Sequence, residues 1–288
     1  MIYGAKGTLI PIGGNEDKGN GEDENHSLDF ITEGILSRVV KESGGNDVRF
    51  VVIPTASSIP DEVGANYIEA FGKLGCNNVT VLDIRKKEDS ETPEAIDLIK
   101  KARCIMFSGG DQSKIANKIG GTTIHKILVD RYTNDRDIVI AGTSAGAMAM
   151  SEEMIAGGSS TEAFQKGAVM MYTGLGLTPG IMFDTHFIQR GRFGRISEAV
   201  AKFPHHIGFG LAEDTGLIIK NGNELKVIGS GMVIVFDGSD LKHNNEKILD
   251  EGTPMTMTNL KVHVLSNSDC YIMNERAVHV LPIDAPFE

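Results

Sequence analysis

Gly142-Thr143-Ser144-Ala145-Gly146 places a serine between two glycines, directly after the apolar run Ile138–Ala141. This spacing fits the G-x-S-x-G nucleophile elbow, in which a serine on a tight strand-to-helix turn exposes its hydroxyl. The glycines have a physical reason, because a Cβ at either position would clash with the neighbouring strand or helix. The N–H groups that begin the helix would favour a developing oxyanion. We predict nucleophilic acyl transfer at Ser144; the alternative is a tight turn with an incidental serine.

A serine nucleophile needs a base that takes its proton and an acid that orients the base. Of the eight histidines, His186 is the best placed, because it follows an apolar run and lies downstream of the serine. Glu213 and Asp214 end the next apolar run, and either carboxylate could orient the imidazole. The order serine, histidine, acid differs from that of the α/β-hydrolases and indicates another serine-hydrolase lineage.

The elements that must position these residues alternate between strands and helices in the first half of the chain. Apolar runs predict strands near 7–12, 48–55, 79–83, 103–107 and 137–141. Apolar residues at helical spacing predict helices near 31–40, 63–74, 92–102 and 124–132. This alternation is typical of a doubly wound parallel sheet, whose ligands bind beyond the carboxyl ends of the strands. The loops at 109–112 and 142–146 should both lie at that edge.

The second half has a different pattern. Residues 156–179 are interpreted as irregular, residues 182–187 as a short strand or turn, and residues 193–203 as a helix. From Gly216 to Val280, short β-branched runs alternate with turns such as Asn221-Gly222 and Asp237-Gly238, which predicts antiparallel hairpins. We predict one α/β domain over 1–288, with a β-rich extension over about 216–288. The acidic stretch Asn15–Ser27 is interpreted as a solvated loop.

Composition limits the partners. The formal net charge of −11 disfavours binding to nucleic acid and to anionic membranes. No apolar stretch approaches the roughly 20 residues that span a bilayer. The three cysteines lie far apart, without metal-ligand spacing, so no disulfide framework, metal or other cofactor is expected. No signal peptide is visible, which predicts a cytoplasmic protein, or a secreted one if a leader was removed.

Four segments in order resemble the cyanophycinases, exopeptidases of the serine-peptidase family that also contains dipeptidase E. They are Ser-Gly-Gly-Asp-Gln at 108–112, Gly-Thr-Ser-Ala-Gly-Ala at 142–147, Asp-Thr-His-Phe at 184–187 and Gly-Leu-Ala-Glu-Asp-Thr at 210–215. The resemblance runs from about Gly7 to the β-rich extension. It implies a fold like the class I glutamine amidotransferases: a three-layer sandwich with a flavodoxin-like, mostly parallel sheet and a C-terminal antiparallel extension. It also implies release of β-Asp-Arg dipeptides from the C-terminal end of cyanophycin.

The resemblance implies roles at individual positions. Ser144 would be the nucleophile, His186 the base and Glu213 the orienting acid, with the N–H groups of Gly110 and Ala145 as oxyanion donors. The implied substrate-binding residues are Gln112, Asp184, Thr185, Arg190, Arg192 and Arg195. The family has glutamine where this chain has Thr185, which puts the identity of the substrate in doubt.

The basic cluster Arg190, Arg192 and Arg195 is a local anomaly in an acidic chain. Arginine suits bidentate recognition of a carboxylate, which an exopeptidase needs at a chain end. We therefore predict that the cluster lies at the mouth of the serine site; the alternative is a solvated helix face that pairs with Glu198. The expected partner is a peptide with β-linked aspartyl-arginine units, and a homodimer is an open expectation. Two other functions stay open: a dipeptidase for another aspartyl dipeptide, and a catalytically silent small-molecule binding module.

Overall fold

The largest sheet has a parallel centre. The computed structural model describes residues 4–21, 27–158, 164–282 and 284–285. The parallel strands, in spatial order, are β1 (Thr8–Ile12), β5 (Val139–Thr143), β4 (Cys104–Phe107), β2 (Phe50–Ile53) and β3 (Val79–Val81). All except β3 are buried along their whole length, as expected for strands that helices cover on both faces. The predicted parallel sheet is thus confirmed.

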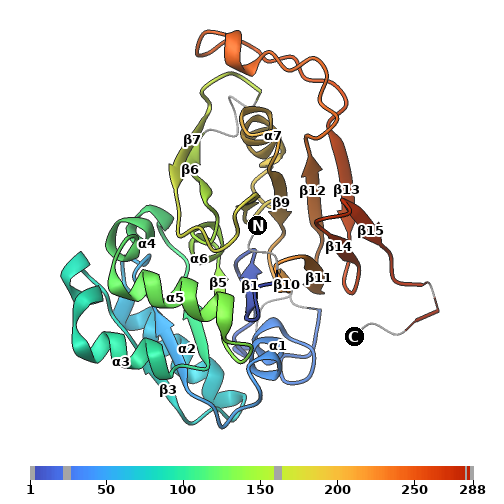
Figure 1. The fold of residues 1–288 in the computed structure, drawn as a ribbon. Helices are drawn as coiled ribbons and strands as arrows, with labels where there is room; N and C mark the ends of the chain where they lie inside the picture. Colours follow the sequence, from blue (N-terminus) through green and yellow to red (C-terminus); the bar gives the residue numbers. More distant parts are fainter. Residues whose placement is uncertain (1–3, 22–26, 159–163, 283, 286–288) are drawn as a thin grey trace.

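Helices cover both faces of this sheet (Figure 1). One apolar core joins the sheet to α1 (Ile35–Glu42) and α2 (Pro60–Lys73). A second core joins the opposite face to α3 (Pro93–Lys101), α4 (Gln112–Ile119), α5 (Thr123–Asn134) and α6 (Ala145–Met148). Two short 3₁₀ helices span Lys87–Glu91 and Glu246–Ile248. The helix α4 was not among the predicted elements.

The C-terminal strands extend the same sheet beyond β1. β10 (Thr215–Lys220) runs antiparallel to β1 and pairs with β11 (Glu224–Gly229), and β14 (Cys270–Ile272) and β15 (Ala277–His279) follow. The Asn221-Gly222 turn joins β10 to β11 with positive φ angles at both residues, so this predicted hairpin is confirmed. β10 pairs with β1, and Glu213 and Asp214 directly precede β10. These two residues therefore lie next to Gly13 and Gly14, which directly follow β1.

A second, four-stranded sheet carries the rest of the chain. It consists of β8 (Ile181–Asp184), β9 (Ile207–Leu211), β12 (Val233–Asp237) and β13 (Lys261–Leu265), and α7 (Phe193–Lys202) packs on it. In Figure 1 these elements stand above the parallel sheet, beside the hairpin β6 (Glu153–Gly158) and β7 (Val169–Thr173). That hairpin corrects the interpretation of residues 156–179 as irregular. The turn at Asp237-Gly238 also differs from expectation, since β12 pairs with a strand that begins only at Lys261.

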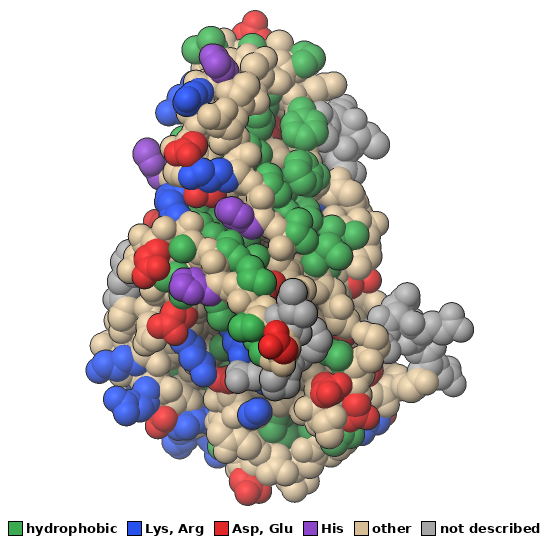
Figure 2. Space-filling model, turned by 90° about the vertical axis from the view of Figure 1, so that its right-hand side faces the viewer, with side chains coloured by type: hydrophobic (Ala, Val, Ile, Leu, Met, Phe, Trp, Pro, Cys, Tyr) green, Lys and Arg blue, Asp and Glu red, His purple; other side chains and the backbone are tan. Residues whose placement is uncertain are grey.

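The face that carries the second sheet is partly apolar. Figure 2 shows hydrophobic side chains gathered on this side of the molecule, with most acidic and basic side chains toward its lower end. The edge strand β13 contributes exposed side chains at Val262 and Val264. Among the described residues, no helix is both long enough and apolar enough to cross a lipid bilayer.

Candidate active site

Ser144 lies at the carboxyl end of β5 in a strained turn. Its backbone has φ 51° and ψ −112°, a conformation that costs a non-glycine residue on the order of 1–3 kcal/mol. A Cβ at Gly142 would lie 2.6 Å from the backbone of Gly146, and one at Gly146 would lie 2.6 Å from the carbonyl oxygen of Phe107 on β4. The two glycines therefore let strand and helix approach closely, and the turn presents the serine at the edge of the sheet.

His186 reaches Ser144 from the second sheet. It lies two residues beyond the end of β8, and its Nε2 is 2.9 Å from Ser144 Oγ. Its backbone N–H donates to the carbonyl of Gly13 at 2.8 Å, which fixes the turn against the end of β1. A Cβ at Gly14 would lie 2.4 Å from the imidazole, so the space that the ring occupies exists only because this residue is glycine.

Glu213 completes a chain of hydrogen bonds with these two residues. Its Oε1 is 2.6 Å from His186 Nδ1, and its Oε2 accepts from Asn15 Nδ2 at 3.2 Å. Asp214 faces another way, because it accepts from the hydroxyl of Ser230 at 2.6 Å. The two carboxylates that the sequence left open are thus distinguished: Glu213 contacts the imidazole, and Asp214 holds the turn between β11 and β12.

The environment of His186 favours its neutral form. Burial is the largest influence and lowers the pKa of the imidazole below 6.5, while the hydrogen bond to Glu213 raises it. The positive charges of Arg190 and Arg192 lower the pKa further. The ring is therefore mostly neutral at pH 7, the form in which Nε2 can accept a proton from Ser144.

Two N–H groups next to the serine have no acceptor among the described residues. Gly110 has φ 139°, and a Cβ there would lie 2.2 Å from the carbonyl oxygen of Ala56. Ala145 is the first residue of α6, where backbone N–H groups have no partner within the helix. Within the described part of the chain, neither N–H donates to another group of the protein. Both are thus free to donate to an oxyanion.

Two cavities flank Ser144. The histidine-side cavity has a volume of about 690 Å³, and its walls include Glu16, Lys18, Tyr67, His186 and Glu213. The arginine-side cavity has a volume of about 430 Å³, and its walls include Gln112, Met148, Thr185, Arg192 and Arg195. Gly110, Ser144 and Arg190 line both. The serine therefore lies on the boundary between two spaces of different chemistry.

The arginine cluster lines the arginine-side cavity, but Asp184 lies behind it. Asp184 is fully buried, and its carboxylate accepts from both Arg192 and Arg195. Its observed contacts are therefore with these arginines rather than with the cavity. Glu198 is 3% exposed and accepts from the backbone N–H of Gly167, so the alternative of a solvated face that pairs with Glu198 is wrong.

Gln112 and Thr185 have protein partners as well. The side-chain amide of Gln112 donates to the carbonyls of Ile155 and Ala156 at 2.9 Å each, which ties α4 to β6. The hydroxyl of Thr185 donates to the sulfur of Met148 at 3.3 Å, and the residue is fully buried. The wall at Thr185 is therefore short, and no side-chain amide extends from it into the cavity.

The stretch interpreted as a solvated loop supplies residues that the sequence did not single out. Glu16 is only 3% exposed and accepts from the hydroxyls of Tyr67 and Thr143 at 2.5 Å each. Lys18 pairs with it at 2.9 Å. Residues 22–26 of the predicted loop lie outside the described residues. One signal was present in the sequence, because Glu16 closely follows a strand that ends in a glycine pair, at the edge where ligands bind.

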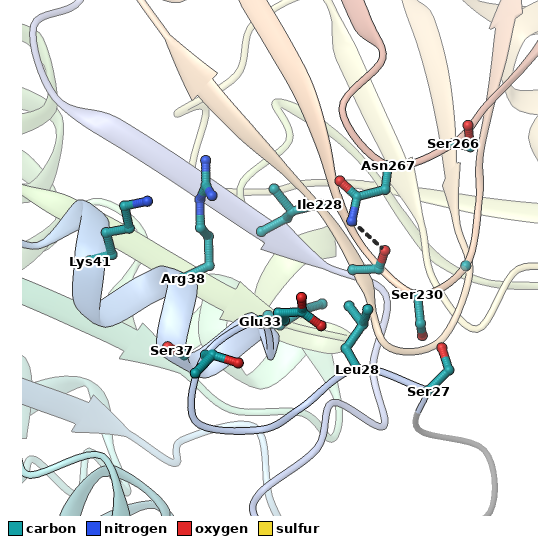
Figure 3. A pocket seen from close by; sticks show the side chains of 14 residues that line it. Ser27, Leu28, Glu33, Ser37, Arg38, Lys41, Ile228, Ser230, Ser266 and Asn267 are labelled. Carbon is teal, nitrogen blue, oxygen red and sulfur yellow. Dashed lines mark hydrogen bonds between the residues drawn. The ribbon is translucent and has the colours of Figure 1, made fainter. Parts of the chain in front are cut away.

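A further cavity of about 560 Å³ lies away from the serine, between α1 and the connections that follow β11 and β13. Figure 3 shows Arg38 and Lys41 projecting from α1 on one side, with Ser230 and Asn267 on the other. Its lining contains no histidine and none of the predicted site residues. This cavity therefore offers no histidine base to the serines that line it.

The chain is 34% identical over 273 residues to a cyanophycinase of Trichormus variabilis, covering 95% of this chain and 88% of that protein. It is 32% identical over 266 residues to a cyanophycinase of Geminocystis herdmanii, covering 92% and 93%.

Solved structures share the fold. A peptidase from an acI-B1 actinobacterium superposes with a TM-score of 0.62 at 20% identity, over 92% of this chain and 98% of that one. A putative peptidase E of Listeria monocytogenes gives a TM-score of 0.51 at 18% identity, over 78% and 99%. The family model that matches residues 19–227 is that of Peptidase family S51. The chain therefore belongs to Peptidase family S51 and is a serine peptidase.

Proposed function

We propose that this protein is an exopeptidase that hydrolyses cyanophycin, multi-L-arginyl-poly-L-aspartate, to β-Asp-Arg dipeptides through an acyl-enzyme on Ser144. One observation carries the proposal: Ser144, His186 and Glu213 form a continuous chain of hydrogen bonds between two cavities. The similarity to cyanophycinases over nearly the whole chain supports this choice of substrate.

In the acylation step, His186 Nε2 takes the proton of Ser144 Oγ as the oxygen attacks the scissile carbonyl carbon. The carbonyl oxygen gains the negative charge and is stabilised by the N–H groups of Gly110 and Ala145. Glu213 holds Nδ1 in its protonated state and stabilises the imidazolium. When the intermediate collapses, the imidazolium gives its proton to the leaving amine, the C–N bond breaks and an ester to Ser144 remains.

Deacylation repeats these steps with water. His186 takes a proton from the water molecule, whose oxygen attacks the ester carbonyl. Collapse of the second intermediate breaks the bond to Ser144 Oγ, and the imidazolium returns the proton to the serine. The net reaction adds one water across the peptide bond and restores the enzyme, so it needs no oxidant, reductant or metal ion.

The charge of the arginine-side cavity fits the substrate. Each arginyl branch of cyanophycin carries a free α-carboxylate as well as a guanidinium group, so the part of the chain that remains on the serine offers carboxylates that arginines can bind. Arg190 is exposed at the mouth, and Arg192 and Arg195 line the wall. Because both wall residues already pair with Asp184, Arg190 is the arginine best placed to meet a substrate carboxylate directly.

A second substrate class has one observation in its favour. Thr185 is buried against Met148 and leaves a short wall in the arginine-side cavity, where the resemblance implies a glutamine. A cavity without that amide would also accept another aspartyl peptide, such as an α-linked dipeptide. The chemistry at Ser144 would be unchanged, and the bond that is cleaved would differ.

The test is incubation with cyanophycin, a β-Asp-Arg oligomer and an α-Asp-Arg peptide, with products identified by mass. We expect β-Asp-Arg from the first two; cleavage of the α-linked peptide alone would favour the second substrate class. Ser144→Ala should lose about 10⁴-fold or more in rate while its fold stays intact. A fluorophosphonate probe should label the wild type and the control Ser37→Ala on α1, but not Ser144→Ala. An unlabelled, inactive wild type would favour a silent binding module.

We further propose that the protein works in the cytoplasm. Cys76 and Cys104 are buried free thiols, which is in keeping with a reducing compartment. A homodimer stays a prediction that sedimentation velocity would test.

A further inference from the structure

The two cavities at Ser144 have different tasks in the proposed reaction, on which this inference rests. The imidazole that takes the serine proton must later give it to the leaving amine, so the leaving unit lies on the side of the imidazole. His186 lines the histidine-side cavity and is absent from the lining of the arginine-side cavity. The released unit therefore occupies the histidine-side cavity, and the acyl part occupies the arginine-side cavity.

The released unit of a C-terminal exopeptidase carries the free carboxylate of the chain end. An enzyme that selects chain ends needs a cation for this carboxylate on the leaving side. Arg192 and Arg195 line the other cavity and pair with Asp184, so they do not meet this need. Among the residues that line the histidine-side cavity, the cationic side chains are those of Lys18 and Arg190. Arg190 also lines the arginine-side cavity, where the proposed function gives it a carboxylate of the acyl part, which leaves Lys18 for the chain end.

Lys18 is held in one position by its neighbours. Its Nζ lies 2.9 Å from Glu16 Oε1, donates to the Glu16 carbonyl at 3.4 Å, and lies 5.2 Å from the centre of the Tyr67 ring. An ammonium group has three donors, and Glu16 accepts two of them. One donor stays available on a side chain that is 27% exposed, whereas the Glu16 side chain is 1% exposed. The positive end of the pair therefore faces the cavity.

Glu16 itself is fixed by groups on two elements and by Lys18 of its own loop. Tyr67 donates from α2 and Thr143 donates from the end of β5, each at 2.5 Å. These donors and the ammonium hold the pKa of the Glu16 carboxyl below 4.5 against the opposing effect of burial. The carboxylate is thus ionised, buried and fully used by the protein. It positions Lys18 beside the serine turn, because Thr143 directly precedes Ser144.

We propose that Lys18 binds the free α-carboxylate of the terminal aspartyl residue in the leaving unit, and that Glu16 acts as the positioning residue for Lys18. The preference for chain ends then arises from a single fixed ammonium group on the leaving side of the serine. A charge-assisted contact of this kind corresponds to about 10- to 100-fold in kcat/KM.

The experiment compares two β-Asp-Arg oligomers that differ only at the terminal aspartyl α-carboxylate, which is free in one and amidated in the other. Lys18→Gln should lower kcat/KM for the free acid by about 10- to 100-fold and change the value for the amide by less than about threefold. Lys18→Arg should recover most of the loss, because it restores the positive charge. Lys126→Gln on α5 removes the same charge from an exposed site and serves as the control.

Equal losses of Lys18→Gln on both oligomers, or no loss on either, would overturn the role of Lys18 while leaving the proposed function in place. A wild-type protein that cleaves neither oligomer would overturn both. Glu16→Gln should weaken the discrimination between acid and amide in the same direction. Its unfolding midpoint is measured alongside, and a folded Glu16→Gln protein with wild-type discrimination would remove the positioning role.

Discussion

Arg195 donates two hydrogen bonds to Asp184, from Nε to Oδ2 at 2.8 Å and from the terminal nitrogen Nη2 to Oδ1. The aspartate is fully buried and the arginine is 6% exposed. A bidentate pair of this kind leaves the guanidinium little capacity for a substrate carboxylate. Because of this pair, Arg195 is a structural part of the cavity wall. Its removal should therefore lower the stability of the fold.

Arg195→Met should destabilise the fold, because it leaves a buried carboxylate with Arg192 as its remaining cation. Removal of one partner of a buried ion pair costs about 3–5 kcal/mol in the free energy of unfolding. The double variant Asp184→Asn with Arg195→Met should recover part of this loss, since no buried charge is left unpaired. Urea unfolding measures both. A fully stable Arg195→Met protein that loses activity only on peptides with a free C-terminal carboxylate would instead return Arg195 to substrate binding.

The two adjacent carboxylates after β9 should differ sharply in their effect on rate. Glu213→Gln removes the acceptor for Nδ1–H of His186 and favours the wrong tautomer, so kcat should fall by about 10⁴-fold. Asp214→Asn keeps an oxygen that can accept from Ser230 and should keep kcat within about tenfold. Steady-state kinetics on the folded variants measures both values of kcat. The reverse order of the two effects would make Asp214 the orienting acid.

The acid limb of the pH–rate profile should lie below pH 6.5. Burial and two arginines lower the pKa of His186, so the neutral imidazole that accepts the serine proton persists below its usual range. Arg190→Gln removes one of the charges that lower this pKa, so the limb should move to higher pH. The pH dependence of labelling by a small uncharged sulfonyl fluoride reports this without substrate binding.

The matched control for this shift is Arg136→Gln, which makes the same charge change at an exposed residue near the opposite end of β5. The acid limb of the pH profile of this variant should lie at the same pH as that of the wild type. A shift of equal size in both variants would trace the effect to net charge rather than to the position of Arg190.

Sequence patterns predicted the parts of the fold that depend on local signals. The buried strands of the parallel sheet are continuous apolar runs, and Ser144 stands in a spacing that the turn requires. The hairpin of β6 and β7 was missed because glycines interrupt one strand and the other exposes several of its side chains, so neither reads as a buried run. The helix α4 has only Ile115 and Ile119 buried, too few to show a helical period.

The burial of Glu16 could not be read from its neighbours. An acidic residue in a polar stretch is normally solvated. Glu16 is buried because it accepts hydrogen bonds from the hydroxyls of Tyr67 and Thr143, which lie 51 and 127 residues away in the chain. The same holds for Asp184, whose contacts with the arginines depend on how α7 packs on the second sheet. Residue types at strand ends predicted that Ser144 and His186 lie together, but tertiary contacts decide which charged groups line the cavities beside them.

The antiparallel pairing of β10 with β1 has a consequence for the protein during its synthesis. Leu9 pairs with Ile219. The strand β1 therefore cannot form this pairing until residues more than two hundred positions later have been synthesised. A ribosome-bound chain can already display Ser144, but His186 and Glu213 are not yet held beside Gly13 and Gly14. Contacts of such long sequence separation form late in folding. Proteolytic competence is therefore among the last properties that the nascent chain acquires.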